Sequence, residues 1–81
     1  MSVDRVKEVL ASVFSVPAQS LDDRSSQDDI PGWDSVRHMT MVLALEEEFS
    51  VSFSDEQVTQ MLNVGLVRLL TEEALAAQAR E

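Results

Sequence analysis

The 81-residue sequence predicts an all-α fold: a four-helix bundle of three longer helices and one short helix, with a long loop between helices one and two. Three segments carry apolar residues at the three-and-four spacing of an amphipathic helix. A fourth, shorter segment opens with a helix-capping sequence. Only one stretch alternates apolar and polar residues like a strand, and a strand without a partner cannot form a sheet. The length suits one domain over residues 1–81.

The first helix is expected at about residues 3–15. Its apolar positions recur at helical spacing and are Val3, Val6, Val9, Leu10, Val13 and Phe14. Pro17 should end this helix near Val16, because the residue before a proline avoids the α conformation. Residues 17–34 have no period and are rich in Ser, Asp, Pro and Gly, which predicts a long loop. Its large apolar side chains are expected to hold it to the core, and they are Leu21, Ile30 and Trp33.

A second helix is expected at about residues 35–48, with Asp34 at the N-cap position. The side chains predicted to face the core are Val36, Met39, Val42, Leu45 or Glu46, and Phe49. The opposite face would carry Arg37, Thr40, Leu43 and Glu47. Leu43 is the apolar residue on that polar face, so it is a candidate contact point.

The rest of the chain predicts a connector and two more helices. Residues 49–54 indicate an extended connector that tucks Val51 and Phe53 inward. Ser54 and Gln57 form a capping box, which predicts a short helix at about 55–61. The side chains that this helix should bury are Val58, Met61 and Leu62. Asn63 is expected to cap a last helix at about 64–78, whose apolar stripe is Val64, Val67, Leu70 and Ala74, widened by Leu66 and Leu69.

Negative charge is concentrated in one segment. The chain has 15 acids and six bases, a net charge of −9. Residues 22–56 hold ten of these acids and two bases, a net charge of −8. Such a field repels nucleic acid and anionic lipid and favours basic patches on partner proteins. The chain has no cysteine, leader or long apolar run, so we expect a cytoplasmic monomer that binds neither nucleic acid nor membrane.

Ser35 lies where the loop becomes a helix, within the stretch "DDIPGWDSVRHM". A catalytic serine needs an oriented base and an oxyanion hole. His38 would share a helix face with Ser35, but Asp34 is not placed to orient it, and we expect no enzymatic activity. The paired loop acids lack calcium-loop spacing and His38 has no ligand partner, so no metal site is expected. His38 should lie at the surface or be half-buried.

The first turn of the second helix allows two interpretations. Asp34 and Ser35 could be only a helix cap and its neighbour. Arg37 and His38, however, place bases at a helix N-terminus, where they oppose the helix dipole. A phosphate attached to Ser35 would make that arrangement favourable, with Arg37 as a possible phosphate contact. From the residues alone, both interpretations stay open.

Several motifs together resemble the acyl carrier protein family over about residues 3–75. They are the Asp34-Ser35-Val36 tripeptide, "ALEEEF" at 44–49, "FSDEQV" at 53–58 and "NVGLVRLL" at 63–70. The resemblance implies that a phosphopantetheinyl transferase moves 4′-phosphopantetheine from coenzyme A to the Ser35 hydroxyl. The thiol of that group would then carry acyl intermediates as thioesters to separate enzymes.

The resemblance also implies roles for neighbours of Ser35. Asp34 would lie beside the attachment site during modification. The residues implied to face partner enzymes are Val36, Leu43 and Glu47. The partners implied are acyl-loading and acyl-processing enzymes with basic docking patches.

Two positions depart from carriers of fatty acid biosynthesis, which usually have acids where Arg37 and Thr40 stand. "GWDSVRHM" is more similar to free-standing carriers of specialised pathways, such as polyketide biosynthesis or aminoacyl loading. Gly32-Trp33 replaces the "GG" of peptidyl carriers and favours the acyl branch. Two alternatives stay open: an aminoacyl or peptidyl carrier, and an unmodified acidic module that binds a basic partner.

Overall fold

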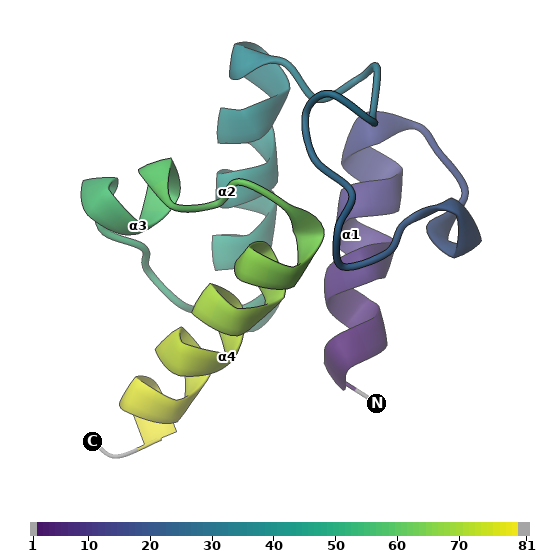
Figure 1. The fold of residues 1–81 in the computed structure, drawn as a ribbon. Coiled ribbons are helices and arrows are strands. Elements are labelled where there is room, and N and C mark those ends of the chain that lie inside the picture. Colours follow the sequence, from purple (N-terminus) through teal and green to yellow (C-terminus); the bar gives the residue numbers. More distant parts are fainter. Residues whose placement is uncertain (1, 80–81) are drawn as a thin grey trace.

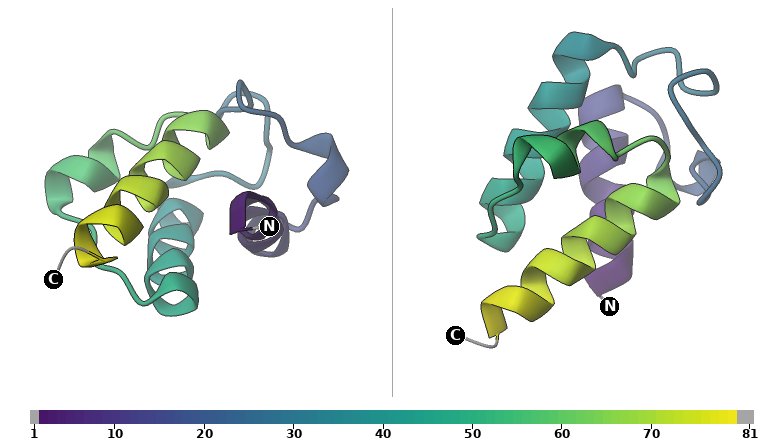
Figure 2. Two further views of the ribbon diagram at one scale, coloured as in Figure 1. Left: turned by 90° about the horizontal axis from the view of Figure 1, so that it is seen from below. Right: turned by 60° about the vertical axis from the view of Figure 1, so that its left-hand side comes forward.

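The computed structural model describes residues 2–79, and its four helices pack as an all-α bundle (Figure 1). The helices are α1 (Ser2–Phe14), α2 (Ser35–Phe49), the short α3 (Asp55–Thr59) and α4 (Val64–Ala79). Helices α1 and α2 lie side by side and run in opposite directions, and α4 crosses them obliquely (Figures 1 and 2). The predicted fold class is confirmed, and each predicted helix end lies within two residues of the observed one.

The long loop between α1 and α2 is only partly irregular. It contains one turn of 3₁₀ helix at Ala18–Ser20 and several tight turns. An isolated antiparallel β-bridge joins Ser26 to Asn63, and residues 2–79 contain no strand. Val64 and Gly65 donate backbone hydrogen bonds of 2.9 Å to loop carbonyls. The loop is therefore attached to the start of α4 as well as to the core.

Helices α1 and α2 end in the same way, with a serine in a left-handed conformation. Ser15 has a φ of 58° and Ser50 a φ of 55°. After α1, the Val16 amide donates to the Ala11 carbonyl at 3.0 Å. After α2, the Val51 amide donates to the Glu46 carbonyl at 3.1 Å. This hydrogen-bond pattern closes many helices, usually with glycine at the left-handed position. Helix α1 therefore ends at Phe14, before Pro17 is reached.

The core draws on α1, α2, α4, the loop and Met61, which follows α3, whereas no residue within α3 is fully buried. Its buried side chains are Val6, Leu10, Phe14, Leu21, Ile30, Trp33, Met41, Val42, Leu45, Met61, Val64, Val67 and Leu70. Trp33 is only 3% exposed and stacks on Phe14 with ring centroids 5.0 Å apart. The three apolar loop side chains, Leu21, Ile30 and Trp33, are all buried in the core, so the prediction that they hold the loop there is confirmed. Burying such side chains stabilises the packed state.

The predicted core face of α2 is wrong at two positions. Val36 is 76% exposed and Met39 is also exposed. The buried residues of this helix are Met41, Val42 and Leu45. Apolar side chains occur all around α2, so two different stripes fit the helical period, and only contact with α1 and the loop selects between them.

The connector follows the prediction, but α3 buries less than expected, since Val58 is only half-buried. Val51 is buried and Phe53 half-buried, and the Phe53 amide donates to a Glu46 carboxylate oxygen at 2.9 Å. The Ser54–Gln57 capping box is present. Helix α3 ends at Thr59, earlier than expected, and Leu62 is 62% exposed. Its predicted burial is therefore wrong, because Leu62 lies in the turn after the helix.

Helix α4 is capped as predicted, since the Asn63 side chain accepts the Leu66 amide at 2.8 Å. The predicted widening of its buried stripe fails at Leu69, which is exposed. The core instead takes in Thr71, whose hydroxyl donates to the Val67 carbonyl at 2.8 Å. A buried hydroxyl that bonds to its own helix avoids the cost of an unsatisfied polar group.

Candidate attachment site and partner surface

Ser35 is the first residue of α2, and its side chain is exposed. Asp34 precedes it in an extended conformation, with φ −109° and ψ −176°. The Asp34 side chain accepts the Arg37 amide at 2.8 Å, and its carbonyl accepts the His38 amide at 2.8 Å. The predicted N-cap is confirmed. The cap fixes the first turn of α2, and α2 begins at one end of the bundle (Figure 1).

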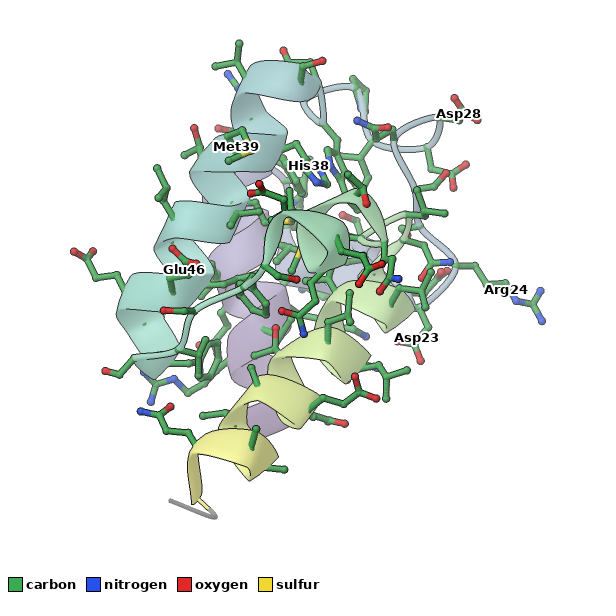
Figure 3. The ribbon with its side chains drawn as sticks, turned by 90° about the vertical axis from the view of Figure 1, so that its left-hand side faces the viewer. Asp23, Arg24, Asp28, His38, Met39 and Glu46 are labelled. Carbon is green, nitrogen blue, oxygen red and sulfur yellow. The ribbon has the colours of Figure 1, made fainter. Side chains whose placement is uncertain are left out.

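His38 was expected at the surface or half-buried, and it is half-buried. Both of its ring nitrogens have hydrogen-bond partners. The Trp33 indole nitrogen donates to Nδ1 at 2.9 Å, and Nε2 lies 3.0 Å from the Val58 carbonyl oxygen. Figure 3 shows His38 beside α3 and the loop, whereas Arg24 extends away from the molecule. A general base must be free to accept the serine proton. His38 is therefore not arranged as a base for Ser35.

The partners of His38 could not be identified from the sequence pattern. Trp33 and His38 are five residues apart and lie on opposite sides of a helix start, so no helical period relates them. One signal was available: they are the only tryptophan and the only histidine of the chain, and both are near Ser35. Indole and imidazole nitrogens usually find partners when they are buried.

Arg37 leans back toward the loop. A Cβ atom built on Gly32 would lie 3.0 Å from Nη1 of Arg37, so the guanidinium lies over this glycine. The side chain is nevertheless exposed at the same turn as Ser35. The phosphate contact expected of Arg37 stays a prediction.

The predicted partner-facing side chains form one exposed stripe on α2. Val36, Thr40, Leu43 and Glu47 are spaced by four, three and four residues, which places them on one side of a helix. All four are exposed, and Leu43 is 61% exposed. The stripe starts next to Ser35 and ends at Glu47, which lines a shallow groove of about 350 Å³ between α1 and α2. A partner on this stripe would also be close to Ser35.

Three of the loop carboxylates, those of Asp22, Asp23 and Asp29, make contacts within the fold. Asp22 accepts the Arg24 amide at 2.8 Å, and Asp29 accepts the Ser26 amide at 3.1 Å. Asp23 forms an ion pair with Arg68 of α4. Across residues 2–79, no group of three or more His, Cys, Asp or Glu side chains could hold a metal ion. None of the helices in the described part is long and apolar enough to cross a membrane.

Comparison with known proteins identifies the family. Residues 4–67 match the family model of the phosphopantetheine attachment site. The acyl carrier protein of Clostridium acetobutylicum is 32% identical over 65 residues, which cover 80% of this chain and 84% of that protein. The chain belongs to the acyl carrier protein family. Another relative, an acyl carrier protein of Rhizobium meliloti, is 33% identical over 73 residues, covering 90% of this chain and 94% of the relative.

The fold of the carrier agrees with this assignment. The solution structure of holo acyl carrier protein from Geobacter metallireducens matches with a TM-score of 0.87 and 26% identity, over 98% of this chain and 91% of that one. The protein is thus a phosphopantetheine-bearing acyl carrier and not an enzyme. The unmodified module and the aminoacyl or peptidyl carrier are not favoured.

Proposed function

We propose that Ser35 is the residue that carries 4′-phosphopantetheine, and that a phosphopantetheinyl transferase attaches it from coenzyme A. The observation that carries this proposal is the position of Ser35: it is exposed, it opens α2 behind the Asp34 cap, and it lies inside the matched segment 4–67. Ser25, by contrast, is a loop residue that is buried, with 7% of its surface exposed.

The local residues fit a covalent phosphodiester. The first amides of a helix are not all satisfied within the helix, and they favour an anion at its N-terminus. The Asp34 side chain accepts a hydrogen bond from the Arg37 amide, which holds the turn, and Ser35 stays exposed. When bound, 4′-phosphopantetheine supplies the thiol that this cysteine-free chain lacks, and the thiol carries acyl groups as thioesters.

The Ser35 oxygen would bond to the phosphorus that bears the pantetheine arm, while the pyrophosphate P–O bond of coenzyme A breaks and adenosine 3′,5′-bisphosphate leaves. The proton on the Ser35 hydroxyl must leave in the same step. His38 cannot take that proton, because its Nδ1 already accepts the Trp33 indole and its Nε2 contacts the Val58 carbonyl. We therefore infer that the transferase supplies the base. In this reaction the carrier contributes an accessible and fixed hydroxyl.

We propose that partner enzymes dock on the exposed α2 stripe through Val36, Leu43 and Glu47. Leu43 and Val36 supply apolar contact area, and Glu47 supplies a charge that a basic patch can recognise. Docking there places the tethered acyl group beside the partner's active site and raises its effective concentration.

We further propose that the carrier serves a specialised pathway, such as polyketide biosynthesis, and not the primary fatty acid pathway. Arg37 and Thr40 support this, because they leave the exposed surface of the first half of α2 without acids. We propose that the carrier works in the cytoplasm, where coenzyme A is available, as a monomer whose residues 1–81 form one domain.

Mass spectrometry of the intact protein tests the attachment site. After incubation with coenzyme A and a broad-specificity transferase, we expect a gain of one phosphopantetheinyl group. Ser35→Ala should abolish this gain, and Ser52→Ala, an exposed serine in the connector, should leave it unchanged. Full modification of the Ser35→Ala variant would refute the assignment.

A further inference from the structure

Two hydrogen-bonded rings lie on either side of the turn that contains Ser35. Trp33 comes two residues before Ser35 and His38 three residues after it. Their side chains meet below the turn: the indole nitrogen of Trp33 lies 2.9 Å from Nδ1 of His38, and the rings are inclined by only 17° with centroids 6.1 Å apart. Residues 34–37, between them, are all exposed.

The hydrogen-bond pattern requires one protonation state of His38. An indole N–H can only donate, so Nδ1 of His38 must be the acceptor and carries no proton. A carbonyl can only accept, so Nε2 must carry the proton and donate to Val58. Both polar atoms of the imidazole ring are satisfied in this neutral form. The hydrogen bond between Trp33 and His38 therefore fixes the relative orientation of the two rings, which an apolar contact of the same size would not do.

These bonds join three separate segments at the base of the Ser35 turn. Trp33 belongs to the loop, is nearly fully buried and stacks on Phe14 of α1. His38 belongs to α2, and the Val58 carbonyl belongs to α3. The Asp34 cap orders the turn internally, but it does not fix the turn relative to α1 and α3. The Trp33–His38 and His38–Val58 bonds do fix it.

We propose that Trp33 and His38 are positioning residues for the modification of Ser35. They hold the turn so that the Ser35 hydroxyl keeps one position relative to α1, α3 and the rest of the bundle that the transferase binds. The inference rests on the proposed function, because it takes Ser35 to be the modified residue. Neither side chain reaches the reacting atoms, so each acts only through the position of the turn.

The kinetics of phosphopantetheine transfer to wild type and four variants test this role. Trp33→Phe keeps an aromatic ring that can stack on Phe14, but that ring is smaller than indole and has no N–H to donate to His38. His38→Ala removes both bonds, and Trp33→Phe/His38→Ala removes both partners. His38→Asn is the conservative variant, because its side-chain oxygen can take the place of Nδ1 as acceptor. Circular dichroism and urea unfolding would fix a temperature at which every variant is folded.

We expect Trp33→Phe and His38→Ala each to lower kcat about fivefold, with KM for the carrier unchanged, because the docking stripe is intact. The double variant should be no slower than His38→Ala, and His38→Asn should recover most of the rate. The proposal would be overturned if only KM changed, or if both single variants kept the wild-type kcat. It would also be overturned if the reductions in kcat multiplied in the double variant, or if His38→Asn recovered none of the rate. If His38→Ala does not fold, the kcat values of Trp33→Phe and His38→Asn still test the positioning role.

Failure of the proposed function would look different. In that case the wild-type carrier itself would not be modified at Ser35, and no comparison of rates would be possible. If the wild type is modified and the variants react equally fast, only the positioning role is wrong.

Discussion

The carbonyl oxygen of Phe14 lies 2.9 Å from the place that a Cβ atom on Gly32 would occupy. Gly32 does not have a positive φ, so the glycine is needed for space and not for its backbone angles. The other glycine, Gly65, has a similar relationship with the Asp23 carbonyl, at 3.1 Å. Both glycines of the chain thus let the long loop approach a helix closely.

Gly32→Ala should therefore destabilise the fold by about 1–3 kcal/mol, because the new methyl group would press on backbone that cannot move alone. Urea unfolding followed by circular dichroism measures this. Gly65→Ala is the matched control: its contact is looser, so the added methyl group should cost less there than at position 32. Equal stability of wild type and Gly32→Ala would contradict the close approach.

Ser50→Gly should stabilise the carrier. Ser50 ends α2 with a φ of 55° and a ψ of 48°, a conformation that costs a residue with a Cβ atom about 1 kcal/mol. Glycine removes that cost but adds freedom to the unfolded chain, so we expect a net gain of about 0.5 kcal/mol. Thermal unfolding measures it. Ser52→Gly, at a position without a positive φ, should give no gain, and a gain of the same size there would show that the left-handed turn is not the cause.

Glu47→Lys should slow acyl transfer to partner enzymes by about fivefold at low salt, because it reverses a charge on the proposed docking stripe. The measurement is the rate of acyl transfer from the modified carrier, with the helical signal as a check on folding. Glu72→Lys makes the same change of net charge at an exposed position on α4. If both variants slow transfer equally, total charge and not the α2 stripe governs recognition.

Much of the fold could be predicted because short-range capping hydrogen bonds determine where three of its helices begin. The Asp34, Ser54 and Asn63 caps each act through a hydrogen bond to a residue three positions further on, so the sequence alone contains the signal. Apolar residues at helical spacing then located the core positions of α1 and α4, such as Leu10 and Val67.

The errors occur where tertiary contacts decide. Val36 and Met39 fit a helical stripe as well as Met41 and Val42 do, and only the packing of α1 against α2 shows which pair is buried. Leu62 was expected inside because it continued the period of α3, but that helix stops after five residues. A period in the sequence does not report where a short helix ends.

The proposed attachment site was the easiest part of the candidate site to predict from the sequence, and the contacts that support it were the hardest. Ser35 and its Asp34 cap follow from a motif, and the helical repeat placed Leu43 and Glu47 but not Val36 on the exposed face. The bond between Trp33 and His38 follows from neither, because it depends on how the loop folds back beneath the start of α2.

The most direct test is to locate the phosphopantetheinyl group on the chain. Tryptic cleavage after Arg24 and Arg37 releases a peptide of residues 25–37, which contains Ser25, Ser26 and Ser35. Fragmentation of this peptide from the modified carrier by tandem mass spectrometry assigns the group to one serine. We predict that every fragment retaining Ser35 carries the added mass and that fragments holding only Ser25 and Ser26 do not. Added mass on those two serines, or on any other peptide, would contradict the central claim.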